Sequence, residues 1–175
     1  MSPDFYSNYK VQLTILSALI VLAHLMLEYL QGGVVTHYFM QYGSLPGISN
    51  WWGLLTFPVF VWMVLSNIDR RKQDGEPKGM STIIYHLLCS ALFGVVVSYL
   101  FIIESSFLDY LMLGLFILAL FLPLYFGEYL VGFTIGAMYV FGANIPLIGG
   151  VILLLILLIL YKFPRMIIMF VQSKV

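Results

Sequence analysis

Long apolar stretches separated by short polar segments run through most of this chain. Four of the stretches reach the length of about 20 residues that an α-helix needs to cross a bilayer. A further apolar stretch, 129–161, would be about 50 Å long as one helix, which is too long for a hydrocarbon layer of about 30 Å. Glycine and proline in the sequence GANIP at 142–146 predict a break there. The pattern therefore predicts six spans, at 11–31, 52–68, 82–103, 107–126, 129–143 and 145–161.

Polar side chains recur along the first span. Thr14, Ser17, His24, Glu28 and Gln31 follow one another at spacings of three, seven, four and three residues, which brings all five to one side of an α-helix. Leucine, isoleucine and valine fill the other sides. A polar edge within a bilayer must face other protein or a water-filled cavity. The stripe therefore predicts a membrane protein with a polar interior, supplied mainly by spans one, three and five.

Composition supports this fold class. Hydrophobic residues make up 62% of the 175 and charged residues only 9%, whereas a soluble domain carries about 25% charged residues. A water-soluble fold is excluded. We expect an all-α, polytopic integral membrane protein, with six transmembrane helices in one compact bundle and residues 1–175 forming a single membrane domain.

Charge placement sets an expected orientation. With six spans, every lysine and arginine falls on one side of the membrane, which the positive-inside rule makes cytoplasmic. We therefore expect both termini in the cytoplasm and the chain in the plasma (inner) membrane, with the first apolar segment retained rather than cleaved. The uncharged stretch 32–50 is then either an external loop or a re-entrant segment. The cations are Lys10, Arg70, Arg71, Lys72, Lys78, Lys162, Arg165 and Lys174.

Charge and cysteine content also exclude some partners. Eight basic and eight acidic residues give a formal net charge of zero, so the chain has no basic surface for nucleic acid and carries no nucleic-acid-binding motif. Its one cysteine, Cys89, permits neither an intrachain disulfide nor a cysteine-based zinc site. The expected surroundings are the lipid bilayer and a small solute or ion, and both a homo-oligomer and a larger membrane complex stay open.

Ionisable residues divide into two groups by expected depth. His24 and Glu28 share a helix face in the outer half of span one, which suits a proton relay or solute site, a metal site with His37 or Glu104 as third ligand, or an internal pair that holds helices together. His37, Glu104 and Asp109 would form an outer polar rim. Glu104 and Asp109 are equally well explained as solvated turn residues.

The second group lies toward the cytoplasmic side. His86 is near the inner end of span three and Glu128 near the inner start of span five, with Asn144 at the break that follows. Gly132 and Gly136 continue the helix side of Glu128 and predict a close helix contact, although short interrupted segments also mark substrate sites in transporters. His86, Ser90 and Gly94 would face the stripe on span one.

Three functions remain open on these residues. The leading one is binding or translocation of a small solute or ion, with proton coupling, at His24, Glu28, His86, Glu128 and Asn144. The second is an intramembrane enzyme acting on a lipid-like substrate, with zinc or iron held by His24, Glu28 and His37. The third is a non-catalytic subunit whose Gly132 and Gly136 face docks on a larger partner. No cofactor is predicted for the first, and the lack of a nucleotide-binding or soluble catalytic domain favours it over an enzyme.

Overall fold

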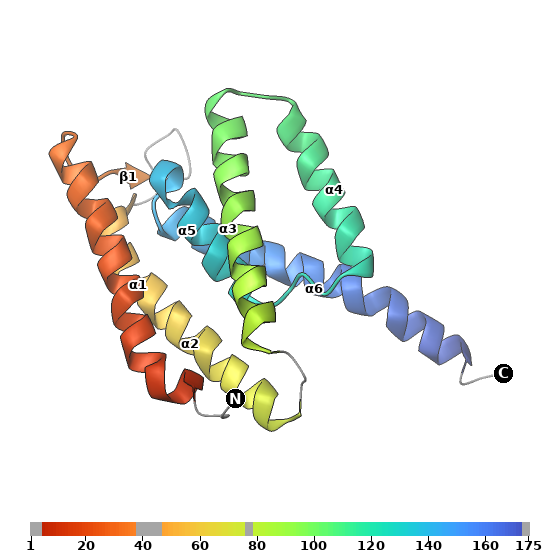
Figure 1. The fold of residues 1–175 in the computed structure, drawn as a ribbon. Helices are drawn as coiled ribbons and strands as arrows, with labels where there is room; N and C mark the ends of the chain where they lie inside the picture. The colour runs from red at the N-terminus through yellow and green to blue at the C-terminus, as the bar shows by residue number, and fades with distance from the viewer. Residues whose placement is uncertain (1–4, 38–46, 76–78, 173–175) are drawn as a thin grey trace.

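The computed structural model describes residues 5–37, 47–75 and 79–172, and these are almost entirely helical (Figure 1). The helices in these ranges are α1 (Phe5–Leu30), α2 (Gly53–Gln73), α3 (Met80–Ile102), α4 (Phe107–Phe121), α5 (Gly127–Phe141) and α6 (Asn144–Gln172). A short antiparallel ribbon of β1 (Thr36–His37) and β2 (Ile48–Ser49) follows α1 and leads into a 3-10 turn, η1 (Asn50–Trp52). The predicted all-α membrane bundle is confirmed.

Each predicted span corresponds to one helix. Four helices, α1, α2, α3 and α6, are long and apolar enough to cross a membrane. The apolar helices α4 and α5 have 15 residues each, which is about 22 Å of helix. They are therefore shorter than the hydrocarbon layer of about 30 Å.

The predicted break between spans five and six is present. Helix α5 ends at Phe141, and Gly142 turns the chain with φ 67° before α6 begins at Asn144. Pro146 falls in the first turn of α6, where its missing N–H breaks no intrahelical hydrogen bond.

Several helix ends differ from the bounds of the predicted spans: α1 begins at Phe5 rather than at residue 11, and α2 ends at Gln73 rather than at residue 68. The fourth helix ends at Phe121 rather than at residue 126, because Pro123 forces Leu122 into an extended conformation with ψ 140°. The sixth helix continues to Gln172 rather than ending at residue 161. Its 29 residues form about 43 Å of helix, since backbone hydrogen bonding persists beyond the point where apolar residues give way to Lys162.

Two tight helix pairs organise the molecule (Figure 1). Helix α1 packs along α2, and α3 packs along α5, while α6 contacts α5 and α4. The buried core is formed largely by α1 and α2. The core residues of these two helices are Val21, Leu25, Phe57, Val61, Val64, Leu65 and Ile68.

Small residues allow α3 and α5 to approach closely. A Cβ atom on Gly132 would clash with the Leu87 carbonyl oxygen and the Ser90 Oγ, and one on Gly136 would clash with the Ala91 carbonyl oxygen. Gly94 of α3 likewise lies against the backbone of Phe133. Ser90 and Gly94 therefore face α5 and not the stripe on α1, contrary to the prediction.

Basic residues gather at one end of the bundle, which we call the basic end. Lys10 at the start of α1 donates to Ser66 near the end of α2, and Arg71 of α2 contacts Glu128 at the start of α5. Lys162 of α6 lies over the ring of Tyr125, which pairs with the ring of Phe126. The ribbon and η1 lie at the other ends of α1 and α2, and we call this the ribbon end.

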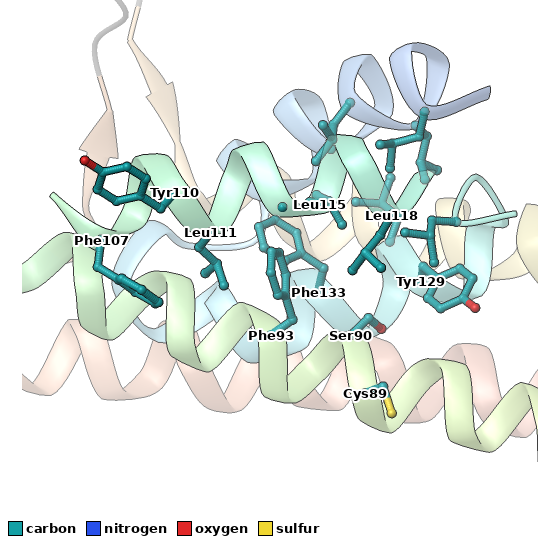
Figure 2. Close-up of a pocket in the computed structure, with 17 residues that line it drawn as sticks. Cys89, Ser90, Phe93, Phe107, Tyr110, Leu111, Leu115, Leu118, Tyr129 and Phe133 are labelled. Carbon is teal, nitrogen blue, oxygen red and sulfur yellow. The ribbon is translucent and has the colours of Figure 1, made fainter. Parts of the chain in front are cut away.

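Helix α4 makes few contacts with α3, to which it is joined by a short turn. A cavity of about 560 Å³ remains between α3, α4, α5 and α6 (Figure 2). It is lined almost entirely by apolar and aromatic side chains, among them Phe93, Leu115, Leu118 and Phe133.

Candidate functional site

Buried polar side chains form one cluster at each end of the bundle. The Glu28 cluster, at the ribbon end, consists of His24, Glu28 and Asn50. The Glu128 cluster, at the basic end, consists of Arg71, His86, Glu128 and Tyr129. Each contains a carboxylate beside a histidine. The side chain of Glu28 is about a tenth exposed, and that of Glu128 is almost fully buried.

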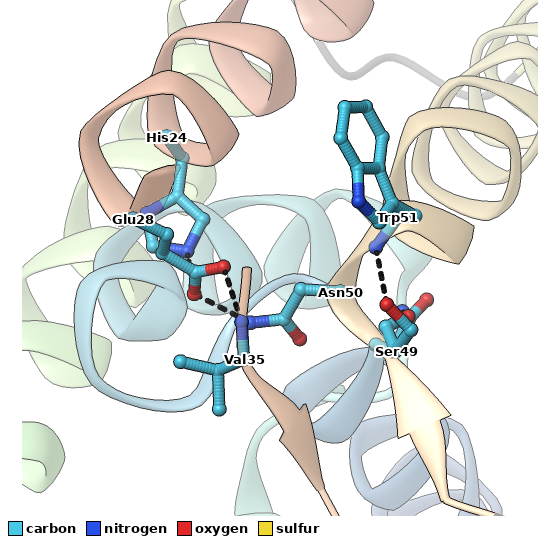
Figure 3. Close-up of polar contacts among 7 residues, drawn as sticks. His24, Glu28, Val35, Ser49, Asn50 and Trp51 are labelled. Atoms are coloured by element: carbon cyan, nitrogen blue, oxygen red, sulfur yellow. Dashed lines mark hydrogen bonds and ion pairs between the residues drawn. The ribbon is translucent and has the colours of Figure 1, made fainter. Parts of the chain in front are cut away.

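The carboxylate of Glu28 is held by groups from three segments (Figure 3). Its Oε1 accepts a hydrogen bond from Asn50 Nδ2 at 2.6 Å and lies 3.1 Å from His24 Nε2. Its Oε2 accepts from the backbone N–H of Val35 at 3.2 Å. These contacts connect α1 to the ribbon and to η1.

Local chain geometry brings these groups to Glu28. Gly32 and Gly33 adopt φ of 126° and 131°, a region open to glycine, and turn the chain back after α1 so that Val35 reaches the carboxylate. Asn50 then donates its backbone N–H to the Val35 carbonyl oxygen at 3.0 Å. Asn50 is 1% exposed. Sequence analysis missed it, because a single asparagine before two tryptophans carries no distinctive spacing.

Asn144 lies at the ribbon end, whereas Glu128, with which it was expected to share a substrate site, lies at the basic end. Its Oδ1 accepts from Thr56 Oγ1 at 2.8 Å, and its Nδ2 donates to the Ser49 carbonyl oxygen at 3.1 Å. The nearby Gly142 lies so close to Asn50 that a Cβ atom would clash with the asparagine carboxamide. The break between α5 and α6 is thus next to the Glu28 cluster.

The Glu128 cluster is built around an ion pair. Arg71 Nη2 donates to both oxygens of Glu128, at 3.1 Å and 2.9 Å, and His86 Nδ1 lies 3.6 Å from Oε1. The His86 ring stacks on Tyr129 with centroids 4.4 Å apart. Because α2 continues to Gln73, Arg71 is part of this helix, and its side chain reaches Glu128. From the sequence, Arg71 was predicted only to lie on the cytoplasmic side, and its contact with Glu128 was not predicted.

The two clusters differ in charge balance. Arg71 compensates the charge of Glu128 directly, whereas the neighbours of Glu28 among the described residues are a histidine, an amide and a backbone N–H. The His24–Glu28 pair therefore has no arginine or lysine beside it in the described part of the chain. Such a pair can take up a proton or balance a bound cation.

The three residues of the predicted outer rim lie in different elements. His37 lies in β1, while Glu104 and Asp109 are exposed at the turn before α4 and in its first turn. Within the described ranges, no three histidine, cysteine, aspartate or glutamate side chains are grouped closely enough to hold a metal ion. His24 and Glu28 are close together, but His37 does not join them as a third ligand.

The Gly132 and Gly136 face is covered by α3. It is therefore not available as the docking surface of a non-catalytic subunit, and that form of the third function is wrong.

The molecule is an integral membrane bundle of apolar helices with two buried polar clusters. No protein-family model, curated protein or solved structure matches the chain.

Proposed function

We propose that the protein binds or translocates a small solute or ion across the membrane with proton coupling. The observation that carries the proposal is the pair of buried histidine–carboxylate contacts, His24–Glu28 and His86–Glu128, at opposite ends of one apolar bundle. Buried ionisable groups in membrane spans are costly, at about 2.5–3.5 kcal/mol near the bilayer centre on insertion scales, and commonly mark ion or proton pathways.

The Glu28 cluster serves as the primary binding site in this proposal. Among the described residues, its carboxylate contacts a histidine, an amide and a backbone N–H but no arginine or lysine. A proton or a small cation therefore neutralises the pair, and uptake of one disfavours the other. That competition is the physical basis of proton coupling.

The Glu128 cluster serves as a closure at the basic end. The Arg71–Glu128 ion pair joins α2 to α5, and His86 of α3 lies beside it. Between the clusters, Val21, Phe57 and Val61 fill the interior with apolar side chains. Passage of a solute thus requires movement of α5 relative to α2, with the break at Gly142 as the hinge.

We place the basic end in the cytoplasm and the chain in a plasma (inner) membrane. The location of Lys10, Arg71 and Lys162 at the same end supports this orientation, because cytoplasmic loops carry an excess of basic residues.

The test measures proton movement in vesicles that contain the purified protein and a trapped pH-sensitive dye. Sodium and potassium ions are added in turn as probes under an imposed pH gradient. We expect one of them to drive proton movement in the wild type. Glu28→Gln keeps the size and hydrogen-bonding capacity of the side chain but removes its charge, and should abolish the coupled movement.

Asp74→Asn is the matched control, since it removes an exposed carboxylate at the end of α2. Its flux should equal that of the wild type. Wild-type flux in Glu28→Gln would contradict the assignment of the Glu28 cluster, and wild-type vesicles that respond to neither ion would exclude these two as the coupled solute.

A further inference from the structure

The cavity between α3, α4, α5 and α6 extends along much of α4 (Figure 2). On α4 it extends from Phe107 in the first turn to Leu118 near the last, a helix length of about 16 Å. Cys89 and Tyr129 line it at the basic-end side of α3 and α5. Its volume of about 560 Å³ lies within the range of about 300–1,000 Å³ that ligand pockets have.

Its position in the bundle indicates what fills it. Packed protein interiors rarely leave voids larger than a water molecule, and an apolar cavity gives water too few hydrogen-bond partners. The cavity is also flanked by the exposed, apolar surface of α4, including Leu113 and Ile117. In a bilayer, the apolar molecules next to that surface are the acyl chains of lipids.

Basic residues lie near the end of the cavity at the basic end. Leu118, Leu124 and Leu157 line this end, and Arg165, two turns beyond Leu157 on α6, donates to the carbonyl oxygens of Leu120 and Phe121. Lys162 lies over Tyr125. Within the described part of the chain, neither cation is paired with a carboxylate. An anionic group at this end would therefore meet uncompensated positive charge.

We propose that this cavity binds one acyl chain of an anionic phospholipid, with the headgroup at Lys162 and Arg165. The bound acyl chain enters between α3 and α4 and lies along α4, while the second acyl chain of the same lipid stays in the bilayer. This site is separate from the Glu28 cluster and shares only Tyr129 with the Glu128 cluster, and it does not depend on solute transport.

Two glycines provide a matched pair of variants. Gly114 of α4 lines the cavity, whereas Gly149 of α6 does not, and neither has an atom within 4 Å of where a Cβ would lie. Gly114→Leu should fill the cavity, while Gly149→Leu adds the same side chain outside it. The purified wild type and variants are incubated with phosphatidylglycerol or phosphatidylcholine, and bound lipid is measured from the intact mass by native mass spectrometry.

We expect the wild type and Gly149→Leu to retain one phosphatidylglycerol. Gly114→Leu should weaken retention at least about tenfold, because several methylene groups lose their burial. Lys162→Gln should weaken phosphatidylglycerol binding about fivefold and leave phosphatidylcholine binding unchanged. Equal retention by the two glycine variants would overturn the cavity as the site, and equal binding of both lipids would overturn the headgroup assignment.

Cys89 supplies an independent readout, since it lines the cavity and is the only cysteine in the sequence. Cys89 and Leu92 are both exposed on α3, but Cys89 lines the cavity and Leu92 does not. Phosphatidylglycerol in the cavity should therefore slow alkylation of Cys89 but not alkylation of the double variant Cys89→Ser/Leu92→Cys. If added lipid leaves the Cys89 rate unchanged, or if the intact mass instead shows a dimer that Gly114→Leu dissociates, the proposal is wrong.

Discussion

At the scale of single residues, Glu28 and Glu128 are stabilised in different ways. Glu128 is 1% exposed and receives two hydrogen bonds from one guanidinium, whereas Glu28 is held by an amide, a backbone N–H and a histidine. A buried carboxylate that loses its only compensating cation becomes a large cost, while removing both partners is often nearly neutral. The folded state should therefore depend on Arg71 far more than on other cations of the same helix.

The Arg71–Glu128 pair can be tested with a double-mutant cycle. Arg71→Met should lower the free energy of unfolding by about 3 kcal/mol or more, because it leaves the Glu128 charge buried. Adding Glu128→Gln should recover most of that loss. Denaturant titration of the purified protein in detergent gives the values, with Arg70→Met, at an exposed site one residue earlier, as the control. Additive effects of the two substitutions would show that the pair is not coupled.

At the scale of helices, the α3–α5 contact depends on the absence of side chains. Gly132 and Gly136 lie against backbone carbonyl oxygens of α3, and backbone cannot move aside as a flexible side chain can. Without a hydrophobic driving force between helices in lipid, close packing of this kind is a main source of helix association. The same substitution should therefore have opposite effects inside and outside the contact.

Gly136→Ala should destabilise the protein by about 1–3 kcal/mol, because the added methyl group separates α5 from α3. Gly149→Ala, in open space on α6, should stabilise it by about 0.4–1 kcal/mol through the reduced freedom of the unfolded chain. Unfolding of both variants in one detergent compares them directly. A Gly136→Ala protein as stable as Gly149→Ala would mean that the helices are not packed this tightly.

These helices also show where prediction from sequence succeeds. Hydropathy and the GANIP break predicted every helix of the described ranges, because helix length and breakage are local properties. In contrast, which helix packs against each helix face depends on residues that are distant in the sequence. The small residues Ser90 and Gly94 indicate a close helix contact but do not identify the neighbouring helix. We expected α1, whereas the neighbour is α5. Arg71 and Asn50 were missed for the same reason, since their partners are distant in the chain.

At the scale of the whole molecule, basic residues and helix directions agree on one arrangement. Helices α1, α3 and α5 run from the basic end toward the ribbon end, as the contacts of Lys10, His86 and Glu128 require, and α2 runs back. Helices α4 and α5 are about 22 Å long each, which is shorter than the hydrocarbon layer of about 30 Å, so their length alone does not establish that they cross the membrane. The number of crossings therefore needs a test that reports on each side of α4.

Single thiols placed after α2, before α4 and at the end of α6 distinguish the arrangements. In a Cys89→Ser background, Asp74→Cys, Ser106→Cys and Gln172→Cys each put one thiol at an exposed position. A membrane-impermeant thiol reagent applied to intact cells should label only Ser106→Cys, and the other two should react once the membrane is opened, because the positive-inside rule places the basic end in the cytoplasm. Labelling of Gln172→Cys together with Ser106→Cys in intact cells would mean that α4, α5 and α6 make an even number of crossings, and the six-span arrangement would be wrong.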